Sequence, residues 1–318
     1  MLTYIIRRLL LAVVVLIMAT CVIFVIMHML PGDPALLYLS QDAYSKFTPA
    51  ELESTKHELG LDKPVLVQYF NWLAGVVQGD LGKSIFRKTK VTSEISNAFP
   101  ISFYLGSLAW VISHAIAIPA GIVCAVRRGK RIDTVLTIVA NIGITAPSFW
   151  IGVLLIYVFG LYLNWLPIFG YTSPLDNFWL SIKKVIMPVF CLCLTPLSGC
   201  IRQTRSAMLE VIRQDYIRTA WSKGLRERII VFKHALKNGV IPVVTLAGMS
   251  IPVILGGEVL IETVFGIPGI GRLAVNALFS RDYAIVQGIV LVIAVFVVLC
   301  NLIVDISYGW LDPRIRYD

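Results

Sequence analysis

The chain contains 318 residues, of which 57% are hydrophobic and only 15% are charged. This composition, with a mean hydropathy of +0.79, excludes an ordinary soluble domain and indicates an integral membrane protein. The net charge of +9 would suggest nucleic acid in a soluble chain. Here the basic residues cluster beside apolar segments, where they set orientation in the membrane, so we expect a bilayer and no nucleic acid as partner.

The first predicted span is the apolar run from Leu9 to about Leu30, which follows Arg7 and Arg8. At about 1.5 Å per residue this run is long enough to cross a bilayer. A signal peptide is the alternative, but the run is longer than the apolar region of a signal and no small-x-small cleavage site follows. We therefore expect residues 1–30 to form a retained transmembrane helix.

Residues 31–97 contain no further span and are predicted to form an extracytoplasmic insert with short helices. Thr48-Pro49-x-Glu51 is a capping box with proline at the first helical position, and it predicts a helix that Gly60 closes. Pro64 begins a second helix. Its apolar stripe, which would suit the membrane surface, consists of Val65, Tyr69, Trp72 and Val76.

Gly82-Lys83-Ser84 ends like a phosphate-binding loop. That loop needs a glycine five residues before Gly82, where this chain has Val77, and a preceding apolar strand, which is also missing from the pattern. We therefore expect no nucleotide-binding site here.

Five further spans are predicted within residues 98–308, and residues 309–318 form a tail. These spans are Phe99 to Val126, Thr134 to about Leu163, Ile182 to about Ile201, Gly239 to about Ile261, and Tyr283 to about Ser307. The third is expected to break near Pro147. Six spans place both termini on one side, and the excess of Lys and Arg in the short loops of that side predicts that both are cytoplasmic.

Six cysteines fall within or at the ends of the predicted spans. Cys191 and Cys193 are two residues apart, which on a helix separates their thiols by about 200°, so small buried hydrophobic side chains are the better interpretation. His28, His57 and His114 do not have the spacing of metal ligands. We expect no metal site and no cofactor in this chain.

A polar, basic loop covers residues 204–238, between the fourth and fifth spans. Ile212, Tyr216 and Ala220 recur at helical spacing with Ile217 and Trp221 beside them, which predicts an amphipathic helix from about Val211 to Lys223. Gly224 suits a left-handed helix cap. A second helical stripe is predicted from Ile229, Phe232, Leu236 and Val240. Pattern alone also allows these helices simply to rest on the lipid surface.

The run DYIRTAWSKG followed by HALKNGVIP resembles the EAA loop of ABC-importer permeases, whose coupling helix docks in a cleft of the ATPase subunit. Arg218 stands where that motif has Glu, and Lys237 stands where it has Pro. With these substitutions, the loop resembles the peptide and nickel branch of the family. HMLPGDPA, ELGLDKP and GDLGKS in the insert resemble the same branch.

The resemblance implies a type I ABC-importer transmembrane domain of six helices that is not itself an enzyme. It implies a second homologous permease, an extracytoplasmic substrate-binding protein and two cytoplasmic ATPase subunits that carry ATP and Mg, in a bacterial or archaeal cytoplasmic membrane. The implied coupling residues are Asp215, Tyr216, Arg218, Thr219, Ala220, Lys223, Gly224 and His234. Implied residues of the translocation path or outer gate are Glu258, Glu262, Arg272 and Asp282.

Di- or oligopeptides are the favoured substrates, and nickel or a nickel chelate is the alternative within the family. A secondary transporter would need no ATPase and would more often show an acidic or histidine relay in mid-membrane, which is sparse in this sequence. A channel would have rows of polar pore-lining residues. The cytoplasmic loop favours an ATP-driven importer over both.

Overall fold

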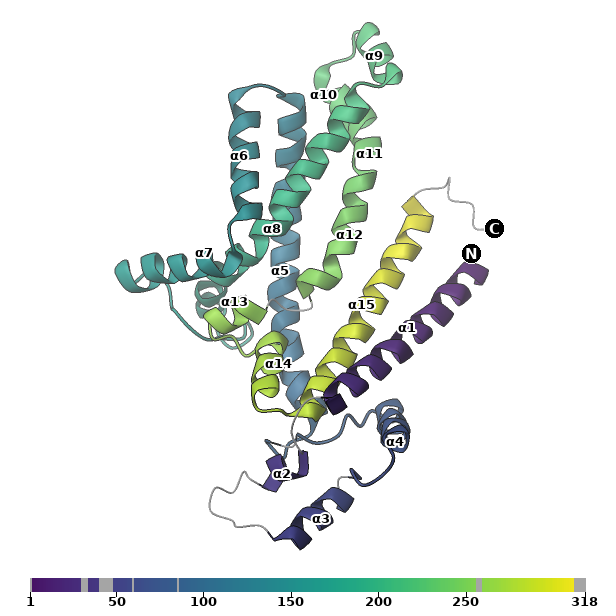
Figure 1. Ribbon diagram of the computed structural model, residues 1–318. Coiled ribbons are helices and arrows are strands. Elements are labelled where there is room, and N and C mark those ends of the chain that lie inside the picture. The colour runs from purple at the N-terminus through teal and green to yellow at the C-terminus, as the bar shows by residue number, and fades with distance from the viewer. Residues whose placement is uncertain are drawn as a thin grey trace. The chain divides into compact units, whose positions relative to one another are not determined.

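The regular elements of the chain are helices (Figure 1). The computed structural model describes residues 2–29, 34–39, 48–58, 60–84, 86–255 and 259–311. These residues form two compact units, the first made of residues 1–101 with 269–298 and the second of residues 102–268 with 299–318.

Four helices are long and apolar enough to cross a membrane, or up to six if each of two bent pairs is one span. The four are Ile6–Met29, Val91–Val126, Phe178–Ile212 and Tyr283–Val304. The bent pairs are Arg131–Thr145 with Ser148–Tyr162, and Glu227–Gly239 with Pro242–Ile251. A multi-pass, all-helical membrane protein is therefore confirmed.

The first unit packs short helices against the ends of long ones. Its elements are α1 (Leu2–Met29), α2 (Pro34–Leu39), α3 (Pro49–Glu58), α4 (Val65–Val77), the beginning of α5 (Val91–Val126), α14 (Ile270–Phe279) and most of α15 (Tyr283–Leu311). Its buried core includes Met27, Val91, Ile95, Ile270, Ile285 and Ile289. The predicted capping box is confirmed, since the Thr48 amide donates to Glu51 Oε2 over 2.7 Å and the Glu51 amide donates to Thr48 Oγ1 over 3.4 Å.

The second unit is built around α8 (Phe178–Ile212), which contacts α6, α7 and α12. Its other elements are α6 (Arg131–Thr145), α7 (Ser148–Leu155), η1 (Ile156–Tyr162), α9 (Asp215–Ser222), α10 (Glu227–Ile229), η2 (Ile230–Ala235), α11 (Leu236–Gly239), α12 (Ile241–Leu255) and α13 (Val259–Val264), with the remainder of α5 and α15. Gly121 allows α5 to approach α8 closely, because a Cβ there would lie 2.5 Å from Thr204 Cβ.

The predicted break near Pro147 is confirmed and is sharp. Helix α6 ends at Thr145, α7 begins at Ser148, and the two axes differ by 99°. Ala146 is extended, with ψ of 127°, which is the conformation that a following proline favours. The third predicted span is therefore two helices of different direction.

Candidate functional site

Helix α9 is the amphipathic helix expected in the loop of residues 204–238, but its predicted start at Val211 is wrong. Helix α8 continues to Ile212, and α9 begins at Asp215 after an extended Gln214. The Gln214 carbonyl oxygen accepts hydrogen bonds from the Ile217 and Arg218 amides, and these bonds start a new helical turn. The apolar spacing runs unchanged across this break, so periodicity alone gave no sign of it.

The inner face of α9 holds the helix against the second unit. Ile217 is fully buried and Ala220 is 6% exposed. They share a hydrophobic cluster with Met208 of α8 and with Ile230 and Ala235 of η2. Gly224 ends this segment with φ of +72°, which confirms the predicted left-handed cap.

The outer face of α9 is exposed and mostly polar. Its exposed residues are Asp215, Tyr216, Arg218, Thr219, Trp221, Ser222 and Lys223. Tyr216 and Trp221, which were expected on the apolar side, are 43% and 48% exposed. Arg218 Nη1 lies 3.4 Å from Asp215 Oδ1, and Asn238 Nδ2 donates to the Tyr216 hydroxyl over 2.9 Å. Six of the predicted coupling residues therefore lie on α9 or at its C-cap, Lys223. Five of the six are exposed, and the sixth, Ala220, faces inward. Gly224 directly follows the C-cap.

The second stripe expected in the loop is only partly correct, since Leu236 packs against the buried cluster and Val240 is half-buried. Ile229 and Phe232 are 41% and 63% exposed, whereas Ile230, Val231 and Ala235 are buried. The reason is that residues 230–235 form a π-helix, whose i to i+5 hydrogen bonds rotate the side chains away from the α-helical register. His234 lies on this segment and is half-buried.

An ion pair that the sequence analysis missed ties α6 to α8. Arg205 Nε donates to Asp133 Oδ1 over 2.7 Å and Arg205 Nη2 donates to Asp133 Oδ2 over 2.9 Å. The Gly129 amide adds a third bond to Asp133 Oδ2, at 3.0 Å. This bidentate geometry is a strong form of ion pair, and the Asp133 side chain is only 6% exposed. The sequence offered one signal for this ion pair, the position of Asp133 directly after a basic loop. Its partner Arg205 is 72 residues away, so the pairing could not be read from the sequence.

Of the two predicted glutamates of the outer gate, Glu258 lies outside the described residues. Glu262 is 3% exposed on α13, and its Oε1 accepts a hydrogen bond from Ser102 over 2.5 Å. This contact lies within the second unit and satisfies a carboxylate that would otherwise be costly to bury.

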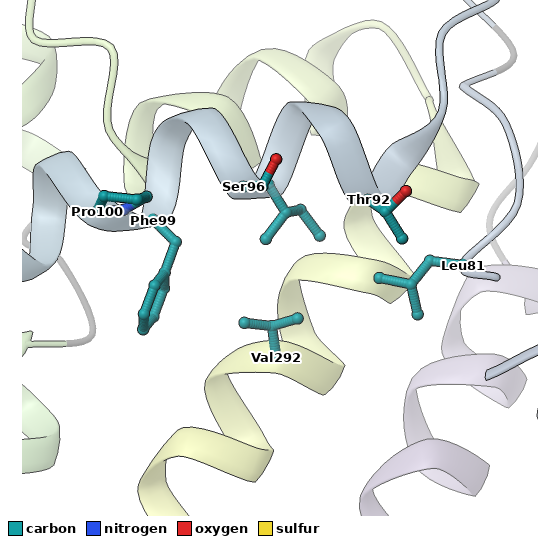
Figure 2. A pocket seen from close by; sticks show the side chains of 7 residues that line it. Leu81, Thr92, Ser96, Phe99, Pro100 and Val292 are labelled. Carbon is teal, nitrogen blue, oxygen red and sulfur yellow. The ribbon is translucent and has the colours of Figure 1, made fainter. Parts of the chain in front are cut away.

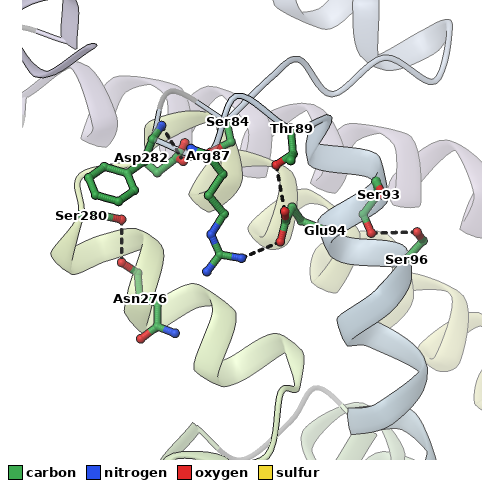
Figure 3. Close-up of polar contacts among 10 residues, drawn as sticks. Ser84, Arg87, Thr89, Ser93, Glu94, Ser96, Asn276, Ser280 and Asp282 are labelled. Carbon is green, nitrogen blue, oxygen red and sulfur yellow. Dashed lines mark hydrogen bonds and ion pairs between the residues drawn. The ribbon is translucent and has the colours of Figure 1, made fainter. Parts of the chain in front are cut away.

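Asp282 anchors a loop within the first unit (Figure 3). It is 1% exposed, and it accepts hydrogen bonds from the Ser84 hydroxyl and, over 3.3 Å, from the Phe86 amide. The Ile285 amide donates to its other oxygen over 3.4 Å at the start of α15. Arg272 is half-buried on α14. These contacts give Asp282 a structural role at the junction of the loop and α15.

An apolar groove of about 370 Å³ opens in the first unit, beside the beginning of α5 (Figure 2). It is lined by Leu81, Thr92, Ile95, Ser96, Phe99, Pro100 and Val292. None of these side chains is ionisable, so none of them can form an ion pair with a charged substrate. Among the described residues no group of three potential metal ligands occurs, and Cys191 and Cys193 are free and buried.

Comparison with known proteins identifies relatives over the whole chain. Residues 117–317 match the family described as binding-protein-dependent transport system inner membrane component, and residues 1–109 match its N-terminal family. The oligopeptide transport system permease protein AppB of Bacillus subtilis is 40% identical over 100% of both chains. The dipeptide transport system permease protein DppB of Escherichia coli is 38% identical over 100% of this chain and 99% of its own.

A solved structure of the MetNI methionine ABC transporter, in an inward-facing conformation, has a similar fold. It matches with a TM-score of 0.55 and 18% identity, over 69% of this chain and 96% of that one. At this identity the likeness concerns the fold alone, and it agrees with a type I importer transmembrane domain.

Proposed function

The chain belongs to the family of binding-protein-dependent transport system inner membrane components, and on that premise we propose that it is the membrane-spanning subunit of an ATP-driven importer of di- and oligopeptides. The observation that carries the proposal is the full-length similarity to relatives named as oligopeptide and dipeptide permeases. A nickel complex is the alternative substrate, and no relative described above is named for it.

The proposed complex contains this chain, a second homologous permease, two ATPase subunits that bind ATP and Mg, and a binding protein that delivers the peptide. Both termini and α9 face the cytoplasm in this arrangement, because the short basic loops lie on that side. The ATPases must be cytoplasmic as well, so α9 is on the correct side to meet one of them.

Helix α9 is the proposed contact with an ATPase subunit. Its inner face is fixed to α8 and η2 by Ile217 and Ala220, while Asp215, Arg218 and Thr219 remain exposed. A helix that is fixed on one face and polar on the other transmits a push or pull to the elements that hold it. Closure of the ATPase dimer would move α9, and α8 would move with it.

The Asp133–Arg205 pair extends this connection to α6. Since it links the first turn of α6 to the last part of α8, the two helix ends move together when α8 moves. Transport then requires that ATP and the loaded binding protein favour the same conformation of the permease. A ligand with equal affinity for two conformations does not shift the equilibrium between them.

The test is co-purification of the chain with the products of neighbouring genes, followed by ATPase assays in nanodiscs. Stimulation by a peptide-loaded binding protein is the expected result. Stimulation only by a nickel-loaded protein would keep the mechanism and overturn the substrate. If no ATPase co-purifies, an ATP-independent secondary transporter becomes the better proposal.

A further inference from the structure

Helix α4 carries no charged side chain, although it lies in the segment between the first two spans, and its two amide side chains are Gln68, beside His28, and the exposed Asn71. Its 13 residues contain no Asp, Glu, Lys, Arg or His. Tyr69, Trp72 and Val76, from the stripe expected to face the membrane surface, pack inward instead. The opposite face exposes Leu66, Phe70 and Val77, which are 72%, 63% and 82% exposed. The neighbouring α3 shows that this is no general property of the segment, because its sequence PAELESTKHE is largely polar.

The inner face of α4 is attached to the last turns of α1. Tyr69 Oη lies 2.9 Å from Thr20 Oγ1, and the Tyr69 and Phe24 rings meet edge to face with centroids 5.3 Å apart. Thr20 Oγ1 donates to the Ile17 carbonyl over 2.8 Å, so the Tyr69 hydroxyl donates to Thr20. One turn beyond Phe24, His28 Nε2 lies 3.1 Å from Gln68 Oε1.

These contacts set the depth of α4. Helix α1 is a candidate span that ends at Met29. Thr20 lies nine residues before that end, or about 13 Å along the axis, and the hydrocarbon core is about 30 Å thick. The Tyr69 side chain therefore reaches the level of the acyl chains, while the neighbouring Gln68 lies beside His28, one residue before the end of α1, and keeps the α4 backbone near the polar surface. The Tyr69 and Thr20 hydroxyls satisfy each other there, which removes the cost of burying either one away from water.

The length of α4 and its flanks agree with this depth. At 13 residues it extends about 20 Å, too short to cross the core. Charged side chains occur just outside it, with Asp62 and Lys63 before and Asp80 after. This is the pattern of a helix that lies within one leaflet with its ends at the polar surface.

We propose that α4 is embedded in the membrane leaflet in which α1 ends, and that lipid acyl chains cover Leu66, Phe70 and Val77. The occupant is lipid because α4 continues the apolar surface of α1, of which only 17% is buried within the chain. Among exposed residues on that surface are Val22 and Val25, at 57% and 51%. The proposal concerns only these two helices and is independent of the transported substrate.

Photocrosslinking in native membranes tests it. Benzoylphenylalanine placed at Leu66 or Phe70 reacts with the C–H bonds beside it, and mass spectrometry identifies what it captured. Leu10, 63% exposed on α1, is the positive control, and the exposed Glu53 of α3 is the negative one. We expect adducts of phospholipid mass at Leu66 and Phe70 with a yield close to that at Leu10 and about tenfold above that at Glu53.

Two results would overturn the proposal. Capture of a second permease or a binding protein in place of lipid would show that α4 is a protein-docking surface. A lipid yield at Leu66 and Phe70 equal to that at Glu53 would place the helix in water. Because ATPase activity is not part of the readout, neither result bears on the coupling role of α9.

Discussion

Helices α4 and α9 are both short, both stand beside a long helix, and both are held by one buried face. In α4 that face is Tyr69 and Trp72 against Phe24, and in α9 it is Ile217 and Ala220. The outer faces differ in charge: α4 exposes leucine, phenylalanine, valine and one asparagine but no charged side chain, whereas α9 exposes aspartate, arginine and threonine beside Tyr216 and Trp221. The buried face decides where a peripheral helix sits, and the exposed face decides whether lipid or a polar partner covers it.

The largest expected effect comes from a charge on the inner face of α9. Ala220→Asp would place a carboxylate in a hydrophobic cluster, at a cost of about 2–5 kcal/mol. We expect the complex to insert but to lose its substrate-stimulated ATPase activity. The matched control is Thr219→Asp, the same change on the exposed neighbour, and the two are compared by Tm because Thr219 itself lies on the proposed coupling face. A Tm for Ala220→Asp no lower than for Thr219→Asp would show that the inner face of α9 does not hold the helix.

The next effect comes from the ion pair that ties α6 to α8. Asp133→Asn leaves the partly buried Arg205 without its bidentate partner and should lower stability by about 2 kcal/mol. We expect a lower Tm in nanodiscs and weaker stimulation of the ATPase. Asp215→Asn is the control, because that carboxylate is 96% exposed in its pair with Arg218. A Tm for Asp133→Asn no lower than for Asp215→Asn would contradict a structural role of the pair.

A smaller effect is expected where α4 meets α1. Tyr69→Phe removes one donated hydrogen bond and leaves Thr20 bonded to the Ile17 carbonyl, which should cost about 1 kcal/mol. Limited proteolysis of residues 31–97 should become faster, with ATPase activity retained. Phe70→Tyr adds a hydroxyl on the exposed face instead, and it should leave the proteolysis rate unchanged. Faster cleavage in the Phe70→Tyr variant alone would reverse the assignment of the two faces.

The smallest effect on stability is expected on the outer face of α9. Arg218→Ala removes an exposed pair at 3.4 Å, worth less than about 0.5 kcal/mol, so Tm should not change measurably. Stimulated ATPase activity should nevertheless fall severalfold, because the face that meets the partner is altered. Normal stimulation would remove Arg218 from the coupling surface, and a large drop in Tm would show that its role is within the fold.

Local signals predicted several features correctly because each depends on residues close together in the chain. The Thr48–Glu51 capping box, the break at Pro147 and the left-handed Gly224 all follow from backbone chemistry within a few residues. The start of α9 and the first two members of the second stripe, Ile229 and Phe232, were wrong because a turn and a π-helix changed the register without changing the apolar spacing.

The sequence by itself determined that this chain is a multi-pass helical membrane protein, since the apolar runs and the basic loops beside them are visible in the order of the residues. Only the tertiary structure decided how its polar groups are used. Asp133 meets Arg205, Glu262 meets Ser102, and Tyr69 meets Thr20, all from distant positions in the chain. The physical reason is that buried polar atoms must find partners, while sequence spacing carries no record of which distant helix supplies each one.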